Sequence, residues 1–207
     1  TPNSGIVGST TVDHPFANPT VDTKYYVKIT DANQCEEIDS VIVRVPPTIC
    51  GHTFELDHII GNSHEVTTIN LNGFARQYSG DYLIKSERLI LENGTFYLSP
   101  GTTWYVQSQL DPEWYPTGVI SLGQNATLFM KGAKITSVCD TAWSGVVAGA
   151  DSRVILETNG LDSCEISNAF IGLRLLHNTR ASITAAKFIN NAYASVQVER
   201  IATFNSP

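Results

Sequence analysis

The chain has 207 residues, with 13 Lys and Arg against 20 Asp and Glu, and a formal net charge of -7. This acidic balance excludes a general nucleic-acid binder, which needs a basic face to meet phosphates. At 42% hydrophobic residues the chain is too apolar for intrinsic disorder, and no apolar run reaches the roughly 18 residues of a membrane span. The low share of charged residues, 16%, is typical of secreted β-proteins.

Residues 1–47 have the pattern of β-sandwich strands. The segment 23–30 alternates in polarity, turn residues occupy 31–34, and 40–45 alternates again before Pro46-Pro47. An isolated hairpin is only marginally stable in water. We therefore expect the remaining strands of this unit to lie upstream of the first residue.

Residues 48–82 show only weak periodicity and are predicted to form a connector and N-terminal cap. From 83 to 207 a repeat is visible. Gly118, Gly145 and Gly172 each open an apolar stretch, and both intervals are 27 residues. Such a period indicates a solenoid, in which each repeat buries its apolar face against the next.

Three short alternating strands per repeat predict an all-β fold with a right-handed parallel β-helix. The strand at Val196 follows Leu173 by only 23 residues, and extra residues fall near 157–163, so the corners vary in length. Polar outward positions are Lys134, Glu165, Arg174, Lys187 and Gln197. The inward positions are predicted as Val119, Ser121, Leu128, Met130, Ala133, Ile135, Val146, Ala148, Val154, Leu156, Cys164, Ile166, Leu173, Leu175, Ile183, Ala186, Phe188, Val196 and Val198.

The four cysteines are Cys35, Cys50, Cys139 and Cys164. No CxxC pair is present, which argues against zinc, and the even count suits two disulfides in an oxidising compartment. Their connectivity does not follow from sequence. Cys164 falls on an inward position and is expected to be a buried free thiol.

The first segment resembles the end of a PKD-like or immunoglobulin-like repeat of bacterial surface proteins exported by the type IX secretion system. The matching stretches are 1–6, 18–27, 30–35 and 39–43. The family usually has Gly where Gln34 stands. Its cysteine commonly pairs with one near the domain start, which is absent here, so the resemblance implies that the partner of Cys35 is missing or is Cys50.

The repeat region, about 83–200, is similar to a β-helix variety of such surface proteins. Gly132-Ala133-Lys134-Ile135-Thr136 and the stretch 139–147 carry the resemblance. It implies the same export route and an extracellular or cell-surface address on a Gram-negative-type bacterium. Members carry a C-terminal sorting domain that is absent here. The chain is therefore expected to be a fragment that continues beyond Pro207, or whose last coil another subunit covers.

Asparagine recurs at one kind of turn, as Asn168-Ala169 and Asn191-Ala192. The two side chains either stack as a ladder inside the corner, each amide bonding the next coil, or are ordinary solvated turn residues.

The long turn 107–116 is the best candidate for ligand binding, because loops on a rigid solenoid carry binding residues. Trp114 and Tyr115 can stack on a sugar ring, and Asp111 and Glu113 can bond hydroxyls or act as a carboxylate pair. Glycoside cleavage needs two carboxyls about 5–9.5 Å apart. The alternative is that both aromatic rings pack on the coil beneath.

The basic residues available as the base of a polysaccharide lyase are scattered along the chain: Lys134, Arg174, His177, Arg180 and Lys187. We interpret these basic residues as part of a solvent-exposed face without catalytic function. His52, His58 and His64 match no zinc signature and are predicted to be surface residues. No catalytic residue, metal or cofactor is therefore assigned. Ser40 and Thr141 lie in Asp-Ser-Val and Asp-Thr-Ala triplets that resemble the O-glycosylation motif of the same surface proteins.

The favoured hypothesis is a secreted or cell-surface structural or adhesive protein without catalytic activity. Its expected partners are glycans or other surface proteins, with end-to-end or lateral self-association, and neither nucleic acid nor a membrane span. The alternative is a carbohydrate-active β-helix enzyme, a polysaccharide lyase or glycoside hydrolase, with the 107–116 turn in its cleft.

Overall fold

The computed structural model describes residues 6–7, 16–31, 34–45, 47–108, 117–139, 141–149, 151–199 and 203–205. The chain divides into two compact units, residues 1–47 and 48–207. Each unit is described by itself.

The first unit is built on an antiparallel hairpin of β3 (Thr23–Thr30) and β4 (Glu36–Val43). A second, two-residue pair joins β1 (Ile6–Val7) to β2 (Phe16–Ala17). The turn between β3 and β4 is closed by Asp31, whose carboxylate accepts a hydrogen bond from the Cys35 amide at 2.8 Å. The predicted strand 23–30 is confirmed, whereas its partner starts at Glu36 instead of residue 40.

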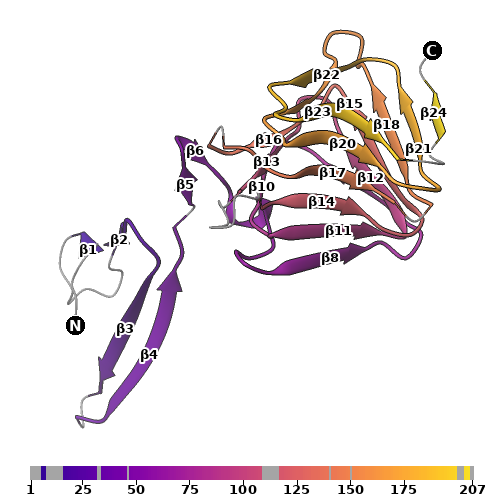
Figure 1. The fold of residues 1–207 in the computed structure, drawn as a ribbon. Helices are drawn as coiled ribbons and strands as arrows, with labels where there is room; N and C mark the ends of the chain where they lie inside the picture. Colours follow the sequence, from indigo (N-terminus) through magenta and orange to yellow (C-terminus); the bar gives the residue numbers. More distant parts are fainter. Residues whose placement is uncertain are drawn as a thin grey trace. The chain divides into compact units, whose positions relative to one another are not determined.

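The second unit consists of three parallel sheets of six strands each, wound so that consecutive strands fall in successive sheets (Figure 1). Sheet 1 contains β7 (Ile59–Ile60), β10 (Asp81–Ile84), β13 (Thr103–Val106), β16 (Lys134–Ser137), β19 (Cys164–Ser167) and β22 (Ala186–Ile189). Sheet 2 contains β8 (Val66–Asn70), β11 (Arg88–Glu92), β14 (Val119–Leu122), β17 (Gly145–Ala148), β20 (Ile171–Leu175) and β23 (Ala194–Val198). Sheet 3 contains β9 (Ala75–Tyr78), β12 (Gly94–Leu98), β15 (Ala126–Lys131), β18 (Arg153–Glu157), β21 (Arg180–Ile183) and β24 (Thr203–Asn205). Parallel strands stacked in this way make the solenoid of a β-helix.

One continuous apolar core fills the space between the three sheets. Alternate residues of strands such as β11, β12, β15 and β18 point inward, so successive coils contribute side chains that stack on one another. Leu128, Val154 and Ile166 are among the core residues with no exposed surface. The predicted inward positions in sheets 1 and 3 are confirmed for Leu128, Met130, Ile135, Val154, Leu156, Cys164 and Ile166.

The parallel ladders begin earlier than residue 83. Strands β7, β8 and β9 pair with β10, β11 and β12 in register, so the segment predicted as connector and cap already contains a coil. Only its first part, β5 (Thr48–Ile49), β6 (His52–Thr53) and the 3₁₀-helix η1 (Leu56–His58), lies outside the coils. Short strands and polar inward residues such as Thr67 weaken the periodicity there.

The inward residues predicted for β14 are wrong by one position. Ile120 and Leu122 are buried, while Val119 and Ser121 face outward. In the ladder Ile120 pairs with Val146, and Val146 pairs with Leu173. The equal spacing of 27 aligned Gly118 with Gly145, whereas the ladder pairs Val119 with Gly145. Because side chains alternate between the two faces of a strand, this shift of one residue reversed the predicted inward and outward positions.

The corner between sheets 2 and 3 contains one residue with a left-handed backbone in each of five coils. Asn72, Asn93, Asn125, Asp151 and Asn178 all adopt a positive φ, between 46° and 62°. Asn and Asp tolerate this left-handed conformation better than other non-glycine residues, which suits them to the bend between one sheet and the next. In the described part of the chain, no helix has the length and apolarity that crossing a bilayer requires.

Cys164 is a buried free thiol, as predicted, and Cys35 is free and exposed. Burial raises the pKa of the Cys164 thiol, which lies 3.1 Å from the Glu157 carbonyl oxygen. We expect one thiol per chain, Cys35, to react with a maleimide in the folded, unreduced protein and two after denaturation, because only an accessible thiolate is a nucleophile. Mass spectrometry after labelling measures this, and labelling of Cys164 in the folded chain would contradict the described core.

Candidate functional site

The corner between sheets 1 and 2 contains the predicted binding turn. Asp111, Glu113, Trp114 and Tyr115 lie outside the described residues. The two ends of the turn are anchored on the next coil. The Ser108 hydroxyl donates to the Ala142 carbonyl oxygen at 2.6 Å, and the Ser144 amide donates to that of Gly118 at 3.0 Å.

Two exposed aromatic rings continue along the same corner. Phe170 and Tyr193 lie in neighbouring coils, joined by a hydrogen bond from the Tyr193 amide to the Phe170 carbonyl. Their rings are stacked, with centroids 5.5 Å apart and an interplanar angle of 17°. Tyr193 is 69% exposed and Phe170 39% exposed. Together they form an exposed stacked pair, called the aromatic platform below, that sequence reasoning missed, although Asn-Ala-Phe and Asn-Ala-Tyr at 168–170 and 191–193 gave a signal for it.

An amide and hydroxyl network runs beside this platform. The Asn190 amide donates to the Asn168 side-chain oxygen at 2.7 Å, and the Asn168 amide donates to the Thr136 hydroxyl at 3.2 Å. The asparagine ladder therefore exists, but its second member is Asn190, because Ser167 pairs with Ile189. Asn191 has another role, since its side-chain oxygen accepts from the Ala169 amide at 3.0 Å.

A column of charged residues crosses the outer face of sheet 1. Lys134, Glu165 and Lys187 stand in register on three successive strands. Lys134 Nζ lies 2.8 Å from Glu165 Oε1, which also accepts a hydrogen bond from Ser167. Partial burial opposes ionisation of Glu165, but the bonds from Lys134 and Ser167 and the charges of both lysines lower its pKa overall. The outward assignments of these residues are confirmed.

The other half of the same face is covered by a hairpin. Strands β5 and β6 pair on either side of a turn that contains Cys50. Phe54, directly after β6, packs in one cluster with Leu83 and Val138. Leu83 points outward from β10 and yet is fully buried. The His52 ring lies 4.5 Å from that of Tyr105, and burial, together with the Asp81 charge, raises the pKa of Tyr105.

A disulfide between Cys50 and Cys139 fastens this hairpin to the end of β16. Of the two alternatives that the family resemblance left for Cys35, a missing partner or Cys50, the pairing with Cys50 is therefore wrong. The two bonded cysteines are 89 residues apart in sequence, and their proximity depends on three complete coils and β16 being in place, which no motif in the sequence reveals. The bond leaves Cys35 without a cysteine partner.

Two of the three histidines predicted to be surface residues take part in packing. His52 contacts Tyr105, and His58 stacks on Tyr82 at 4.3 Å between ring centroids. His58 Nδ1 lies 3.2 Å from the Asp81 carbonyl oxygen. Its ring atoms also come within 4.8 Å of carboxylate oxygens of Glu55 and Asp57, both exposed. Packing on Tyr82 and the bond to Asp81 account for the position of this imidazole.

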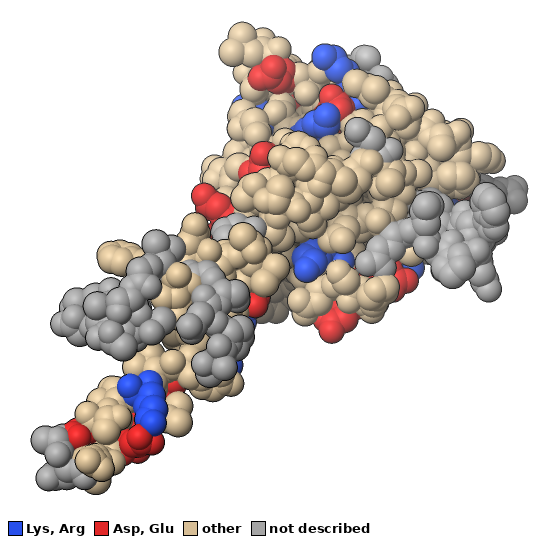
Figure 2. Space-filling model, turned by 90° about the vertical axis from the view of Figure 1, so that its left-hand side faces the viewer, with Lys and Arg blue, Asp and Glu red and all other residues tan. Residues whose placement is uncertain are grey.

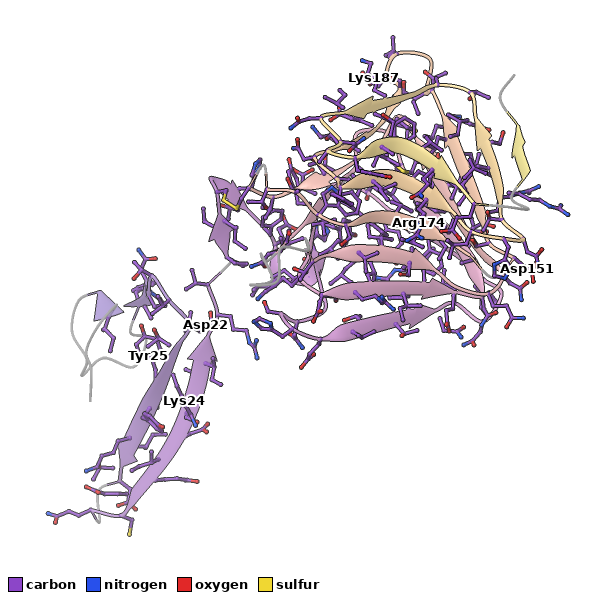
Figure 3. All side chains as sticks on the ribbon, in the orientation of Figure 1. Asp22, Lys24, Tyr25, Asp151, Arg174 and Lys187 are labelled. Carbon is purple, nitrogen blue, oxygen red and sulfur yellow. A yellow bond between two sulfur atoms is a disulfide. The ribbon has the colours of Figure 1, made fainter. Side chains whose placement is uncertain are left out.

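The remaining basic candidates do not gather at one place. Figure 3 shows Lys187 on the last strand of sheet 1 and Arg174 on the outer face of sheet 2, where it pairs with Glu199. Arg180 starts a strand of sheet 3. Figure 2, which shows the side of the molecule that is on the left in Figure 1, has acidic and basic side chains interspersed over the second unit. Among the possible O-glycosylation residues, Ser40 is exposed in β4 and Thr141 is partly buried near the sheet 1–2 corner.

The geometry thus brings together a stacked aromatic pair and an amide network at the sheet 1–2 corner, while the charged column crosses the outer face of sheet 1. Comparison with protein-family models, with curated proteins and with solved structures gives no match. Any function assigned to this corner is therefore inferred from its own residues.

Proposed function

We propose that the chain is part of a secreted or cell-surface structural and adhesive protein of a Gram-negative-type bacterium, without catalytic activity. In this proposal the first unit is the end of a PKD-like or immunoglobulin-like repeat, and the second is a right-handed β-helix exported by the type IX route. The handedness is that of nearly all parallel β crossovers. The proposed address is supported by the disulfide, because such bonds persist in oxidising compartments.

The observation that carries the adhesive role is the stacked pair of Phe170 and Tyr193. Exposed aromatic rings with a polar rim mark interaction sites. The exposed surfaces of the two rings can contact the apolar side of a sugar ring, and the side-chain amide of Asn190 at the same corner can donate a hydrogen bond to its hydroxyls. A neutral or weakly charged glycan fits this combination.

The register weighs against a glycosidase on the outer face of sheet 1. Its two carboxylates, Asp81 and Glu165, stand in one column but three strands apart. At about 4.8 Å per strand their separation is about 14 Å. This exceeds the roughly 5–9.5 Å that glycoside cleavage requires.

The test uses the full chain on a glycan array, followed by reducing-sugar and unsaturated-uronate assays on every polysaccharide it binds. We expect binding without turnover, and at least about ten-fold weaker binding of neutral glycans by the Phe170→Ala/Tyr193→Ala variant. Tyr26→Ala, which removes a tyrosine ring 60% exposed in the first unit, is the matched control. Turnover of any polysaccharide, or equal binding by both variants, would overturn the proposal.

A further inference from the structure

The outer face of sheet 3 differs from the other two in its charge arrangement. Lys134 pairs with Glu165 on sheet 1, and Arg174 pairs with Glu199 on sheet 2. On sheet 3, Arg153 and Arg180 stand in register with each other, both exposed. Neither takes part in an ion pair with any residue that the structure describes.

Two arginines in this arrangement repel each other. Adjacent strands lie about 4.8 Å apart, and like charges directly opposite destabilise a sheet. The repulsion is notable in a chain with a net charge of -7, where acidic partners outnumber basic residues. The nearest acidic residue along the chain is Asp151, at the sheet 2–3 corner, and it is in none of the ion pairs among described residues (Figure 3). An anion between the two guanidinium groups would turn this repulsion into attraction, because arginine binds carboxylates in a bidentate manner.

The arginines extend a polar strip along the solenoid axis. In register below them stand Thr127 and Thr95, so the strip crosses four coils. Its length from Thr95 to Arg180 is three strand spacings, about 14 Å. At the Thr95 end lies a shallow depression lined by Asn72, Gly73, Asn93, Gly94, Thr95 and Asn125.

A parallel column of apolar side chains lies beside the strip. Tyr97, Phe129 and Ile155 face outward in register, and all three are partly exposed. The rings of Tyr97 and Phe129 meet edge to face, with centroids 5.0 Å apart. The outer face of sheet 3 therefore presents one column of arginine and threonine side chains and, next to it, one column of apolar side chains with two aromatic rings.

We propose that the outer face of sheet 3 binds an acidic polysaccharide, extended along the solenoid axis. Its carboxylate or sulfate groups contact Arg153 and Arg180, its hydroxyls contact Thr127 and the depression, and its sugar rings lie against Tyr97 and Phe129. One sugar unit of an extended chain is about as long as the distance between coils, so charges on neighbouring units match the two arginines. Nucleic acid is disfavoured, because two cations on an acidic protein do not form the basic face it needs. The inference deepens the proposed adhesive function by naming a ligand class and a second surface.

The experiment measures binding of the full chain to polygalacturonate, dextran sulfate, neutral dextran and a single-stranded DNA oligonucleotide at low and at high salt. We expect binding to an acidic polysaccharide that weakens with salt, and a loss of at least about ten-fold for each arginine replaced in Arg153→Gln and Arg180→Gln. The two acidic polymers distinguish carboxylate from sulfate recognition. Arg88→Gln, which removes an exposed arginine from the outer face of sheet 2, is the matched control and is expected to bind as the unaltered chain does.

Two results would overturn the inference: acidic polymers bound equally by the double arginine variant, or DNA bound as tightly as polysaccharide. Failure of the adhesive function has a different signature, in which no glycan on the array, neutral or acidic, binds at all. Thermal unfolding of each variant checks that the exposed substitutions leave the fold intact.

Discussion

Replacing Gly145 by Ala is expected to lower the free energy of unfolding of the second unit by roughly 3–5 kcal/mol. Gly145 begins β17 with a φ of 111°, where side chains other than that of glycine are strained. An added Cβ would lie 1.7 Å from the Ile171 carbonyl oxygen of the next coil. That oxygen belongs to the backbone, so relief requires β20 to move away from β17. Urea unfolding followed by circular dichroism measures the effect.

Gly101→Ala is the matched control for this substitution. Gly101 also has a positive φ, 78°, but an added Cβ there meets no atom within 4 Å. It is expected to cost only the backbone strain, about 1–2 kcal/mol. Equal losses in the two variants would show that the close approach of the coils at Gly145 is not as described.

Removing the disulfide with Cys50→Ser/Cys139→Ser is expected to destabilise the second unit by about 2–4 kcal/mol. The bond closes a segment with a sequence separation of 89, and the loss of chain entropy in the unfolded state grows with that length. The hairpin that covers Leu83 and Val138 is also freed to leave sheet 1. For a unit of this size the melting temperature should fall by about 5–15 °C.

Calorimetry with and without reductant measures this effect in two independent ways. Reduction of the unaltered chain should reproduce the shift of the double serine variant, while Cys35→Ser should leave the melting temperature unchanged, because Cys35 is free and exposed. A melting temperature insensitive to reductant would mean that the hairpin is held by packing alone.

Alternation of polarity predicted the solenoid well where strands have one apolar face and one solvated face. Residues such as Val154 and Leu156 could be placed inside because Arg153 and Glu157 beside them are charged or polar. In β14 the polar Ser121 between Ile120 and Leu122 points to the correct face, but the equal spacing of the glycines favoured Val119 and Ser121 as the inward residues. Alternation within the strand is therefore a better guide to the inward face than the spacing between repeats, because corner lengths vary.

The site was less predictable than the fold because it is made between coils. Phe170 and Tyr193 become a platform only when two coils stack, and Arg153 and Arg180 become neighbours only through the register of β18 and β21. Cys50 and Cys139 likewise meet across coils. Corner lengths differ from coil to coil. Without the strand registers, the sequence therefore does not reveal which corner residues lie next to each other in neighbouring coils.

The hairpin bond has a mechanical consequence for a chain under tension. Force entering the second unit at Thr48 reaches Cys50 first, and the disulfide transmits it directly to Cys139 at the end of β16. Strands β7 to β16 lie inside the covalently closed loop, so they cannot be unspooled one after another while the bond is intact. With the disulfide formed, force would act first on the strands from β16 onward. The redox state of this bond would therefore decide whether residues 51–138 can be extended.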